Sequence, residues 1–287
     1  MRRGCYVAKD AFAGAETDPR LGAAIKAGAA VASSRHRDCV ASHHSAARVH
    51  GIEMLHPPDG EIVTLTVEPG RQTGRRMCTD VLRHAAGLPD HHVTKFHGVP
   101  LTTVARTVVD IARTSTFMQG VAVADSALRN DPLLKPAIRA VLRDCERWPG
   151  IDKARRVTEF ADWVPESVLE SCARVVFRDH GLPPPLLQTP ILGRDGRPAA
   201  RVDFCWPEFG TVAEADGMLK YRTQKDLERK YHRDTRIQAV GWEVVHFSWA
   251  ELFADGAGVI DNIRAAFQRG REPSARKRRG GFTQAVG

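Results

Sequence analysis

The chain holds 287 residues, which is enough for two compact domains of ordinary size. Hydrophobic residues make up 43% and charged residues 26%, as in globular proteins, so a largely disordered chain is excluded. The formal net charge of +8 favours a polyanionic partner, although a basic compositional bias explains the charge equally well. The sequence has no apolar run of the roughly 18–20 residues that a membrane span needs, and its N-terminus lacks a secretory pattern. We therefore expect a cytoplasmic protein without a membrane partner.

Several chemistries lack their usual motifs. The six cysteines are scattered and form no CxxC pair, so we expect free thiols, several of them buried, and no structural zinc site. Neither a GxSxG motif nor a glycine-rich phosphate loop occurs. Serine hydrolysis has no support, and no small-molecule cofactor is expected.

The N-terminal half mixes helices with strands. A helix is predicted at 19–32, a short helix capped by Ser42, a strand at 62–67 and a strand pair at 91–104. From Thr103 the apolar spacing becomes helical, with Arg106 and Asp110 as a structural pair, and helices continue over 117–145 with a break near Asp131. We interpret residues 1–115 as an α+β domain and 116–164 as a helical connector.

The C-terminal half alternates between helices and strands in a fixed order. Helices are predicted at 166–179, 224–240 and 250–268, and strands at 186–192, 200–206, 211–216 and 242–247. This order predicts an α/β domain over residues 165–269, with a mixed sheet flanked by helices. The basic stretch 270–287 has too little apolar material to fold and is expected to be a disordered arm.

Two neighbouring strands of this domain carry acidic side chains. Asp203 lies on one strand and Glu214 and Asp216 share a face of the next, so a hairpin turn at 207–210 would bring Asp203 beside Glu214. Carboxylates gathered on one sheet face repel one another unless a cation lies between them, and Mg²⁺ or Mn²⁺ prefers such oxygen ligands. Glu170 on the preceding helix is a further candidate ligand. The alternatives are ordinary strand-end carboxylates paired with arginines, a turn role for Asp216, and a surface pair between Glu170 and Arg174.

Several separated motifs in the C-terminal half together resemble those of a known family. They occur in order as Glu166-Ser167-Val168-Leu169-Glu170, Gly181-Leu182-Pro183-Pro184-Pro185, Gln188, Arg201-Val202-Asp203-Phe204, Glu214-x-Asp216-Gly217, Lys220-Tyr221, Arg233-Asp234 and Gly241-Trp242-Glu243-Val244-Val245. Together they resemble the family related to very-short-patch-repair endonucleases, within the PD-(D/E)xK superfamily. The resemblance implies a restriction-endonuclease-like sheet and a DNA endonuclease that depends on Mg²⁺ or Mn²⁺.

The same resemblance implies roles for single residues. Asp203 and Glu214 take the metal-ligand positions, Glu170 matches the acidic residue of the first core helix, and Gln188 and Arg233 become candidates for orientation or phosphate contact. The superfamily's lysine lies two residues after the second acid, where this chain has Asp216. Lys220 is the substitute that the sequence offers. Very-short-patch-type members also lack that lysine, so activity stays compatible with the pattern.

The N-terminal half has its own resemblance. Arg2-Arg3-Gly4-Cys5-Tyr6, Ser42-His43-x-Ser45-Ala46-Ala47 and Pro100-Leu101-Thr102-x-x-Ala105-Arg106-Thr107-x-x-Asp110 resemble the bacterial abortive-infection antitoxins of type IV toxin–antitoxin systems. In those proteins a winged helix-turn-helix precedes the Arg-Arg-Gly-x-Tyr element, which here stands at residues 2–6. A protein without this module and an upstream start codon both remain open.

Two functions follow as expectations. The first is a metal-dependent endonuclease that hydrolyses phosphodiester bonds in DNA, with Asp203 and Glu214 as metal ligands and Glu170, Asp216 and Lys220 in supporting roles. The second is a non-catalytic, antitoxin-like regulator or interaction protein with a degenerate nuclease fold. A cognate toxin or a repair protein is the macromolecular partner expected besides DNA.

Overall fold

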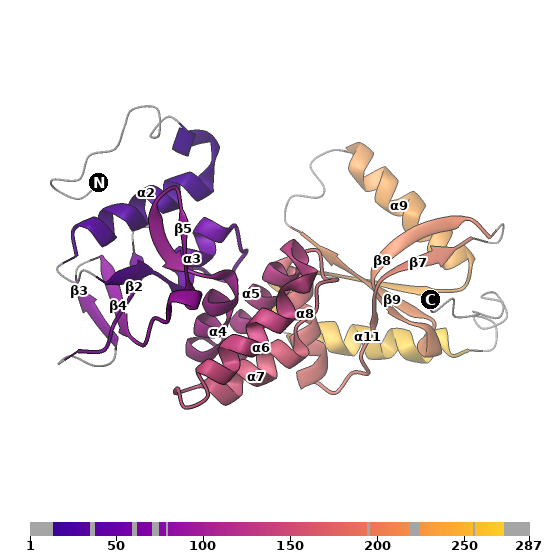
Figure 1. Ribbon diagram of the computed structural model, residues 1–287. Coiled ribbons are helices and arrows are strands. Elements are labelled where there is room, and N and C mark those ends of the chain that lie inside the picture. Colours follow the sequence, from indigo (N-terminus) through magenta and orange to yellow (C-terminus); the bar gives the residue numbers. More distant parts are fainter. Residues whose placement is uncertain are drawn as a thin grey trace. The chain divides into compact units, whose positions relative to one another are not determined.

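The computed structural model describes residues 14–34, 38–58, 62–70, 75–78, 80–193, 196–217, 224–254 and 256–272 (Figure 1). The chain forms two compact units, residues 1–163 and 164–287. Residues 116–163, expected as a connector, thus belong to the first unit. Among the described residues, no helix combines the length and apolar character that a membrane crossing requires.

Unit 1 contains a mixed six-stranded sheet with the strand order β3-β4-β2-β1-β6-β5. Its strands are β1 (Cys39–Ala41), β2 (Val63–Val67), β3 (Arg75–Cys78), β4 (Val81–Ala85), β5 (Val93–Phe96) and β6 (Val99–Thr102). Helices α2 (Pro19–Ala32) and α3 (His43–His50) pack on the sheet, and Ala24, Ala27 and Val49 share a core cluster with Leu65. The mixed α/β class is therefore confirmed for this half.

The second part of unit 1 is helical. It consists of α4 (Val104–Thr114), α5 (Phe117–Asn130), the 3-10 turn η2 (Pro132–Leu134), α6 (Lys135–Asp144) and α7 (Ile151–Phe160). The pairing of Arg106 with Asp110 is confirmed, because Arg106 Nε donates to Asp110 Oδ2 at 2.9 Å and both side chains are fully buried. Arg113 donates to the other carboxylate oxygen at 3.0 Å, and both guanidinium groups stack on the Trp148 ring. This pair holds α4 in the core of the unit.

Unit 2 is built on a mixed four-stranded sheet with the order β10-β9-β8-β7. The elements follow one another as α8 (Val168–Asp179), β7 (Leu186–Leu192), β8 (Pro198–Trp206), η3 (Pro207–Phe209), β9 (Thr211–Asp216), α9 (Gln224–Ala239), β10 (Glu243–Ser248), α10 (Trp249–Ala254) and α11 (Gly256–Gly270). Strands β7, β8 and β9 pair antiparallel, whereas β9 and β10 are parallel and are joined through α9. The expected helix-flanked mixed sheet is confirmed.

The two faces of this sheet have different cores. Phe177 of α8 meets Phe204 and Phe247 edge-on, with ring centroids 5.1 and 5.9 Å apart. On the other face Ile237 of α9 packs with Cys205 and apolar neighbours that include Val202. Figure 1 shows α9 on one side of the sheet and α8 and α11 on the other. The central strand β9 is therefore buried on both faces, whereas the edge strand β7 is largely half-buried or exposed.

Two details of local structure differ from a regular pattern. A regular strand would place Val202 and Phe204 on one face, but Val202 packs on the α9 side and Phe204 on the α8 side. The regular alternation of side chains between the two sheet faces breaks at this level. Gln188 of β7 has a φ of 47°, and the described ladder between β7 and β8 has no pair joining Gln188 to Asp203. The last helix, expected over 250–268, appears as α10 and α11 on either side of residue 255, which lies outside the described residues. Helix α8 starts at Val168 rather than at residue 166, because Ser167 caps it.

Candidate metal centre

Asp203 lies where strands β8 and β9 separate. Their ladder runs from Trp206↔Thr211 to Phe204↔Ala213, and Asp203 follows directly beyond the last of these pairs. Its Oδ2 accepts a hydrogen bond of 2.8 Å from the backbone N–H of Ala215 on β9. The carboxylate therefore bridges the two strands at the level of Glu214, as the hairpin prediction requires.

Gln188 connects two of the acidic residues. Its Nε2 donates to Glu170 Oε2 at 2.9 Å and to Asp203 Oδ1 at 3.1 Å. The positive φ of 47° is unfavourable for a residue with a side chain and occurs where surrounding contacts impose it. The side-chain amide of Gln188 thus holds the Glu170 carboxylate of α8 close to the Asp203 carboxylate of β8. Together with the unfavourable backbone conformation of Gln188, this indicates an organised site rather than a chance surface cluster.

Glu170 is buried in the first turn of α8, so it is not an exposed surface side chain. Ser167 Oγ donates to Glu170 Oε1 at 2.8 Å, and the backbone N–H of Glu166 donates to Oε2 at 2.9 Å. The pKa of Glu170 is raised by burial and by the charge of Asp203, despite these hydrogen bonds. The carboxylate thus caps its helix and also faces Asp203.

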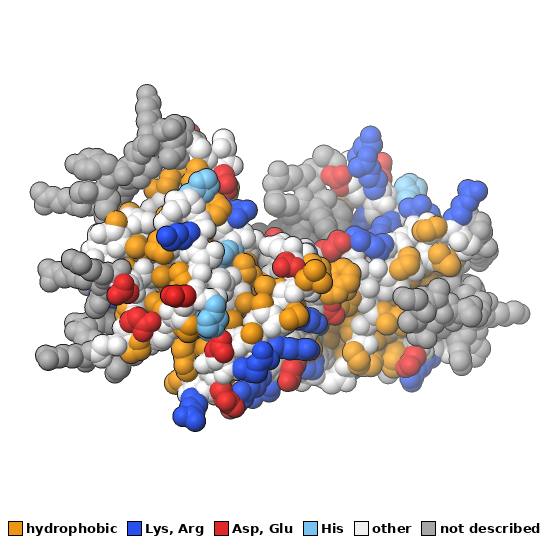
Figure 2. Space-filling view, in the orientation of Figure 1, with side chains coloured by type: hydrophobic (Ala, Val, Ile, Leu, Met, Phe, Trp, Pro, Cys, Tyr) orange, Lys and Arg blue, Asp and Glu red, His pale blue; other side chains and the backbone are white. Residues whose placement is uncertain are grey.

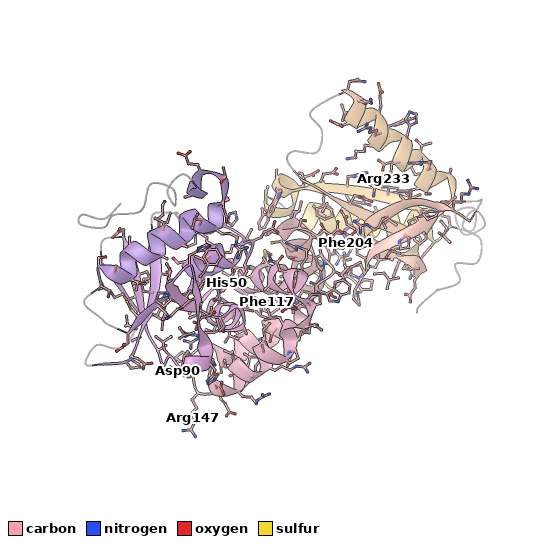
Figure 3. The ribbon with its side chains drawn as sticks, turned by 45° about the horizontal axis from the view of Figure 1, so that its top comes forward. His50, Asp90, Phe117, Arg147, Phe204 and Arg233 are labelled. Carbon is pink, nitrogen blue, oxygen red and sulfur yellow. The ribbon has the colours of Figure 1, made fainter. Side chains whose placement is uncertain are left out.

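Glu214 is the most strongly perturbed acid of the group. It lies on β9 with only 4% of its surface exposed. Burial, together with the charge of Asp203, raises its pKa to about 7 against the opposing effect of Arg233. Arg233 Nη2, on α9 beside the sheet (Figure 3), donates to Glu214 Oε1 at 2.7 Å and also to the carbonyl oxygen of Arg201. Like charges packed this closely are the condition in which a divalent cation is stabilising.

A second charged group adjoins these acids. Asp216, which shares a sheet face with Glu214, forms an ion pair with Lys230 of α9. His246 of β10 stands directly opposite Glu214 in the parallel ladder, with Nδ1 3.2 Å from Asp216 Oδ2 and Nε2 2.9 Å from Asp234 Oδ2. Burial alone would lower the pKa of His246, but Asp216 and Asp234 outweigh it and raise the pKa. Asp216 is therefore part of an ion-pair network rather than only a turn residue.

The structure brings most of the expected site residues together. Gln188 links Glu170 to Asp203, Asp203 accepts from the backbone of Ala215 next to Glu214, and Arg233 pairs with Glu214. Asp216 shares a sheet face with Glu214 and pairs with Lys230. Lys220 lies outside the described residues. The sequence analysis missed three participants, namely Lys230, Asp234 as an ion-pair partner, and His246. Only the register of β10 against β9 could have indicated His246.

The donor chemistry of the three acids suits a small hard cation. Gln188 joins the carboxylates of Glu170 and Asp203, and burial, with a smaller contribution from the charge of Asp203, raises the pKa values of Glu170 and Glu214. In the described residues these three carboxylates do not form a group whose oxygen atoms all lie within 4.8 Å of one another. Mg²⁺ and Mn²⁺ select oxygen ligands of this kind. Asp203 and Glu214 are the residues that would hold such an ion, and Glu170 would face it through Gln188 or a water.

Unit 1 offers another group of ligand-type side chains. Nε2 atoms of His91 and His92 lie 2.9 and 3.1 Å from Asp144 Oδ2. However, Arg106 Nη1 lies 3.1 Å from His92 Nδ1, and a guanidinium can only donate. Nδ1 must therefore accept, which leaves the proton on Nε2, where a metal would need the lone pair. Burial, reinforced by Arg106, lowers the pKa of His92, so the ring is neutral and donates to Asp144. These three side chains therefore form a hydrogen-bonded structural cluster rather than a metal site.

Comparisons with known proteins add relatives without a described activity. No protein-family profile matches the chain, and no solved structure matches it. Two uncharacterized proteins of Mycobacterium tuberculosis, from strains CDC 1551 and H37Rv, are each 34% identical to it over 169 residues. The match covers 57% of this chain and 62% of each relative. These relatives are similar to the chain over somewhat more than half its length and leave its activity to be inferred from the site.

Proposed function

We propose that unit 2 is a metal-dependent DNA endonuclease that hydrolyses phosphodiester bonds. The observation that carries the proposal is the grouping of three acids: Gln188 joins Glu170 to Asp203, and burial together with the charge of Asp203 raises the pKa values of Glu170 and Glu214. The order of one helix, three strands, a helix and a strand around a mixed sheet agrees with the resemblance to very-short-patch-repair endonucleases. Mg²⁺ or Mn²⁺ at such a site supplies Lewis-acid activation of the phosphodiester and of the attacking water.

The residues around the acids have distinct tasks in this proposal. Asp203, fixed by the Ala215 N–H, and Glu214 hold the cation, while Gln188 keeps Glu170 directed at Asp203. Arg233 pairs with Glu214, and it would be placed to contact a phosphate oxygen if a cation took over that carboxylate. A cationic partner in either case would avoid the large cost of an unpaired buried charge.

Lys230 is our candidate for the missing strand lysine. It reaches Asp216 from α9, so its ammonium group lies at the position on β9 where the resemblance implies a lysine side chain. A cation there stabilises the charge that develops on the phosphoryl oxygens. Lys230→Met should lower the cleavage rate while leaving the affinity for Mn²⁺ intact. Arg229→Met is the matched control, since Arg229 is a neighbouring cation on α9 that is largely exposed.

The proposal is tested by plasmid cleavage with Mg²⁺ or Mn²⁺, combined with calorimetric titration of Mn²⁺. Asp203→Ala and Glu214→Ala should each lose Mn²⁺ binding and reduce the cleavage rate on the order of a thousandfold, which corresponds to several kcal/mol. Asp261→Ala on α11 removes an exposed carboxylate and should change neither quantity. Cleavage that survives both site variants would assign the activity to another site or to a contaminant.

A non-catalytic regulator or interaction protein is the second candidate. The observation that favours it is that Glu214 and Asp216 already have protein cations, Arg233 and Lys230, as partners. A degenerate site would keep such ion pairs as structural links. Wild-type protein that binds no Mn²⁺ and cuts neither plasmid, mismatched nor single-stranded DNA would establish this alternative over the first.

A further inference from the structure

Helix α6 of unit 1 presents a row of cations. Lys135, Arg139 and Arg143 follow one another at intervals of four residues, and Arg147 continues the row in the turn after the helix. Residues four apart lie on one helix face, about 6 Å apart along the axis. The buried side chains Ile138, Val141 and Leu142 lie on the adjoining face, whereas the four cations are exposed. The basic row is therefore part of the outward face of an amphipathic helix.

The row has no acidic partner of its own. Several other exposed arginines do have a carboxylate within reach, as Arg201 has Glu166 at 2.7 Å and Arg269 has Glu243 at 2.8 Å. Within the described residues, no ion pair joins Lys135, Arg139, Arg143 or Arg147 to an acid. The single acid of α6, Asp144, is engaged by His91 and His92 instead. The row thus keeps its charge available to a partner.

The surroundings of the row favour a polyanion. Figure 2 shows Lys and Arg side chains gathered over α6 and α7, with a few acids among them, and Figure 3 shows Arg147 directed away from the helices. A recess of about 290 Å³ lies between these two helices, with Lys135, Arg139 and Arg155 at its rim and Leu128, Ile138 and Leu142 among its lining residues. By contrast α9, which is also polar, alternates acids and bases along its length, as a helix face that only meets solvent commonly does.

We infer that the row Lys135, Arg139, Arg143 and Arg147 is a binding surface for the phosphate backbone of double-stranded DNA. Cations spaced by about 6 Å along a helix contact successive phosphates of one strand and carry no base recognition, so the surface supplies affinity without sequence preference. Arginine suits this role because its planar guanidinium contacts phosphate oxygens through two N–H groups. The inference does not depend on the endonuclease activity proposed for unit 2.

The test measures binding of the full-length protein to a fluorescein-labelled 20-base-pair duplex by anisotropy, in EDTA so that no cleavage occurs. The row variant is Lys135→Gln, Arg139→Gln, Arg143→Gln and Arg147→Gln combined. The matched control combines Arg178→Gln, Arg229→Gln, Arg264→Gln and Arg269→Gln, which removes the same formal charge from exposed positions elsewhere. Circular dichroism and urea midpoints verify that both variants fold.

The row variant should bind at least about a hundredfold more weakly near 0.1 M salt, and the slope of log K against log salt should fall by about 3 to 4, since each phosphate contact contributes roughly 0.9. The control should stay within about threefold of wild type, because it leaves those contacts in place. Equal losses in both variants, unchanged binding by the row variant, tighter binding of an RNA duplex of the same sequence, or no DNA binding by wild type would each overturn the inference. Wild-type DNA binding in this assay, together with no DNA cleavage in a separate assay with Mg²⁺ or Mn²⁺, would refute the proposed endonuclease and leave this surface standing.

Discussion

The raised pKa of Glu214 predicts a pH-dependent stability that can be measured without any metal. The folded protein binds this proton up to about pH 7, whereas an ordinary glutamate releases it near its usual value of 4.5. The folded state is therefore favoured most strongly below pH 4.5, and this stabilisation is lost as the pH rises through about 7. A shift of this size corresponds to about 3 kcal/mol, at roughly 1.4 kcal/mol per pKa unit.

Glu214→Gln isolates this contribution, because glutamine has the shape of the protonated acid and cannot lose a proton. Its Oε1 can still accept from Arg233. Relative to wild type, the variant should gain up to about 3 kcal/mol in free energy of unfolding between pH 5 and pH 8. The titrations of Glu170 and His246 are shared by both proteins and largely cancel in the difference.

The assay is urea unfolding in EDTA at pH 5, 6, 7 and 8, followed by tryptophan fluorescence. Trp206 and Trp242 are buried in unit 2 and report on the unit that contains Glu214. Asp261→Asn, at an exposed carboxylate of α11, is the control and should show no pH-dependent difference. A Glu214→Gln difference that is constant across this pH range would refute the argument that burial holds the proton on Glu214.

Three further predictions concern packing and backbone geometry. Phe204→Ala empties the centre of the aromatic cluster with Phe177 and Phe247 and should cost unit 2 about 3–5 kcal/mol, read from its urea midpoint. Asp110→Ala leaves the buried Arg106 without its carboxylate partner and should lower the free energy of unfolding of unit 1 by about 3–5 kcal/mol. A decrease under about 1 kcal/mol would mean that the contacts with Trp148 and Gly87 suffice to stabilise that guanidinium. Gly150→Ala should cost more than about 2 kcal/mol in the same assay, since Gly150 has a φ of 81° and a Cβ there would overlap the carbonyl oxygen of Arg113. A Gly150→Ala protein as stable as wild type would show that the chain between α6 and α7 adjusts freely.

The strands of unit 2 could be predicted because they lie between turn signals such as those at 193–197 and 207–210. The segments 186–192 and 211–216 were expected with the bounds that β7 and β9 have. In unit 1 the strands β1, β3 and β4 were not expected, although β5 and β6, with four residues each, were. A strand of three residues, such as Cys39–Ala41, has no periodicity to detect, and its place between β2 and β6 depends on long-range pairing.

The residues of the candidate site also divide into those that local sequence predicts and those that long-range pairing positions. Asp203 and Glu214 could be predicted, because a short hairpin turn fixes which residues of two strands are neighbours. Lys230, Arg233 and His246 reach the acids from α9 and β10, whose positions are set by the parallel crossover rather than by local sequence. Gln188 bridges Glu170 and Asp203 in a backbone conformation with positive φ, which no local sequence pattern predicts.

Pro190 has a consequence for how copies of the protein behave at high concentration. Strand β7 ends the four-stranded sheet on one side, and an exposed strand edge is a template for pairing with another chain. Pro190, exposed in the middle of β7, has no N–H to offer to an added strand. Two molecules therefore resist joining their sheets through β7, and the protein gains protection from edge-to-edge aggregation at the same strand whose inner side supplies Gln188 to the acidic cluster.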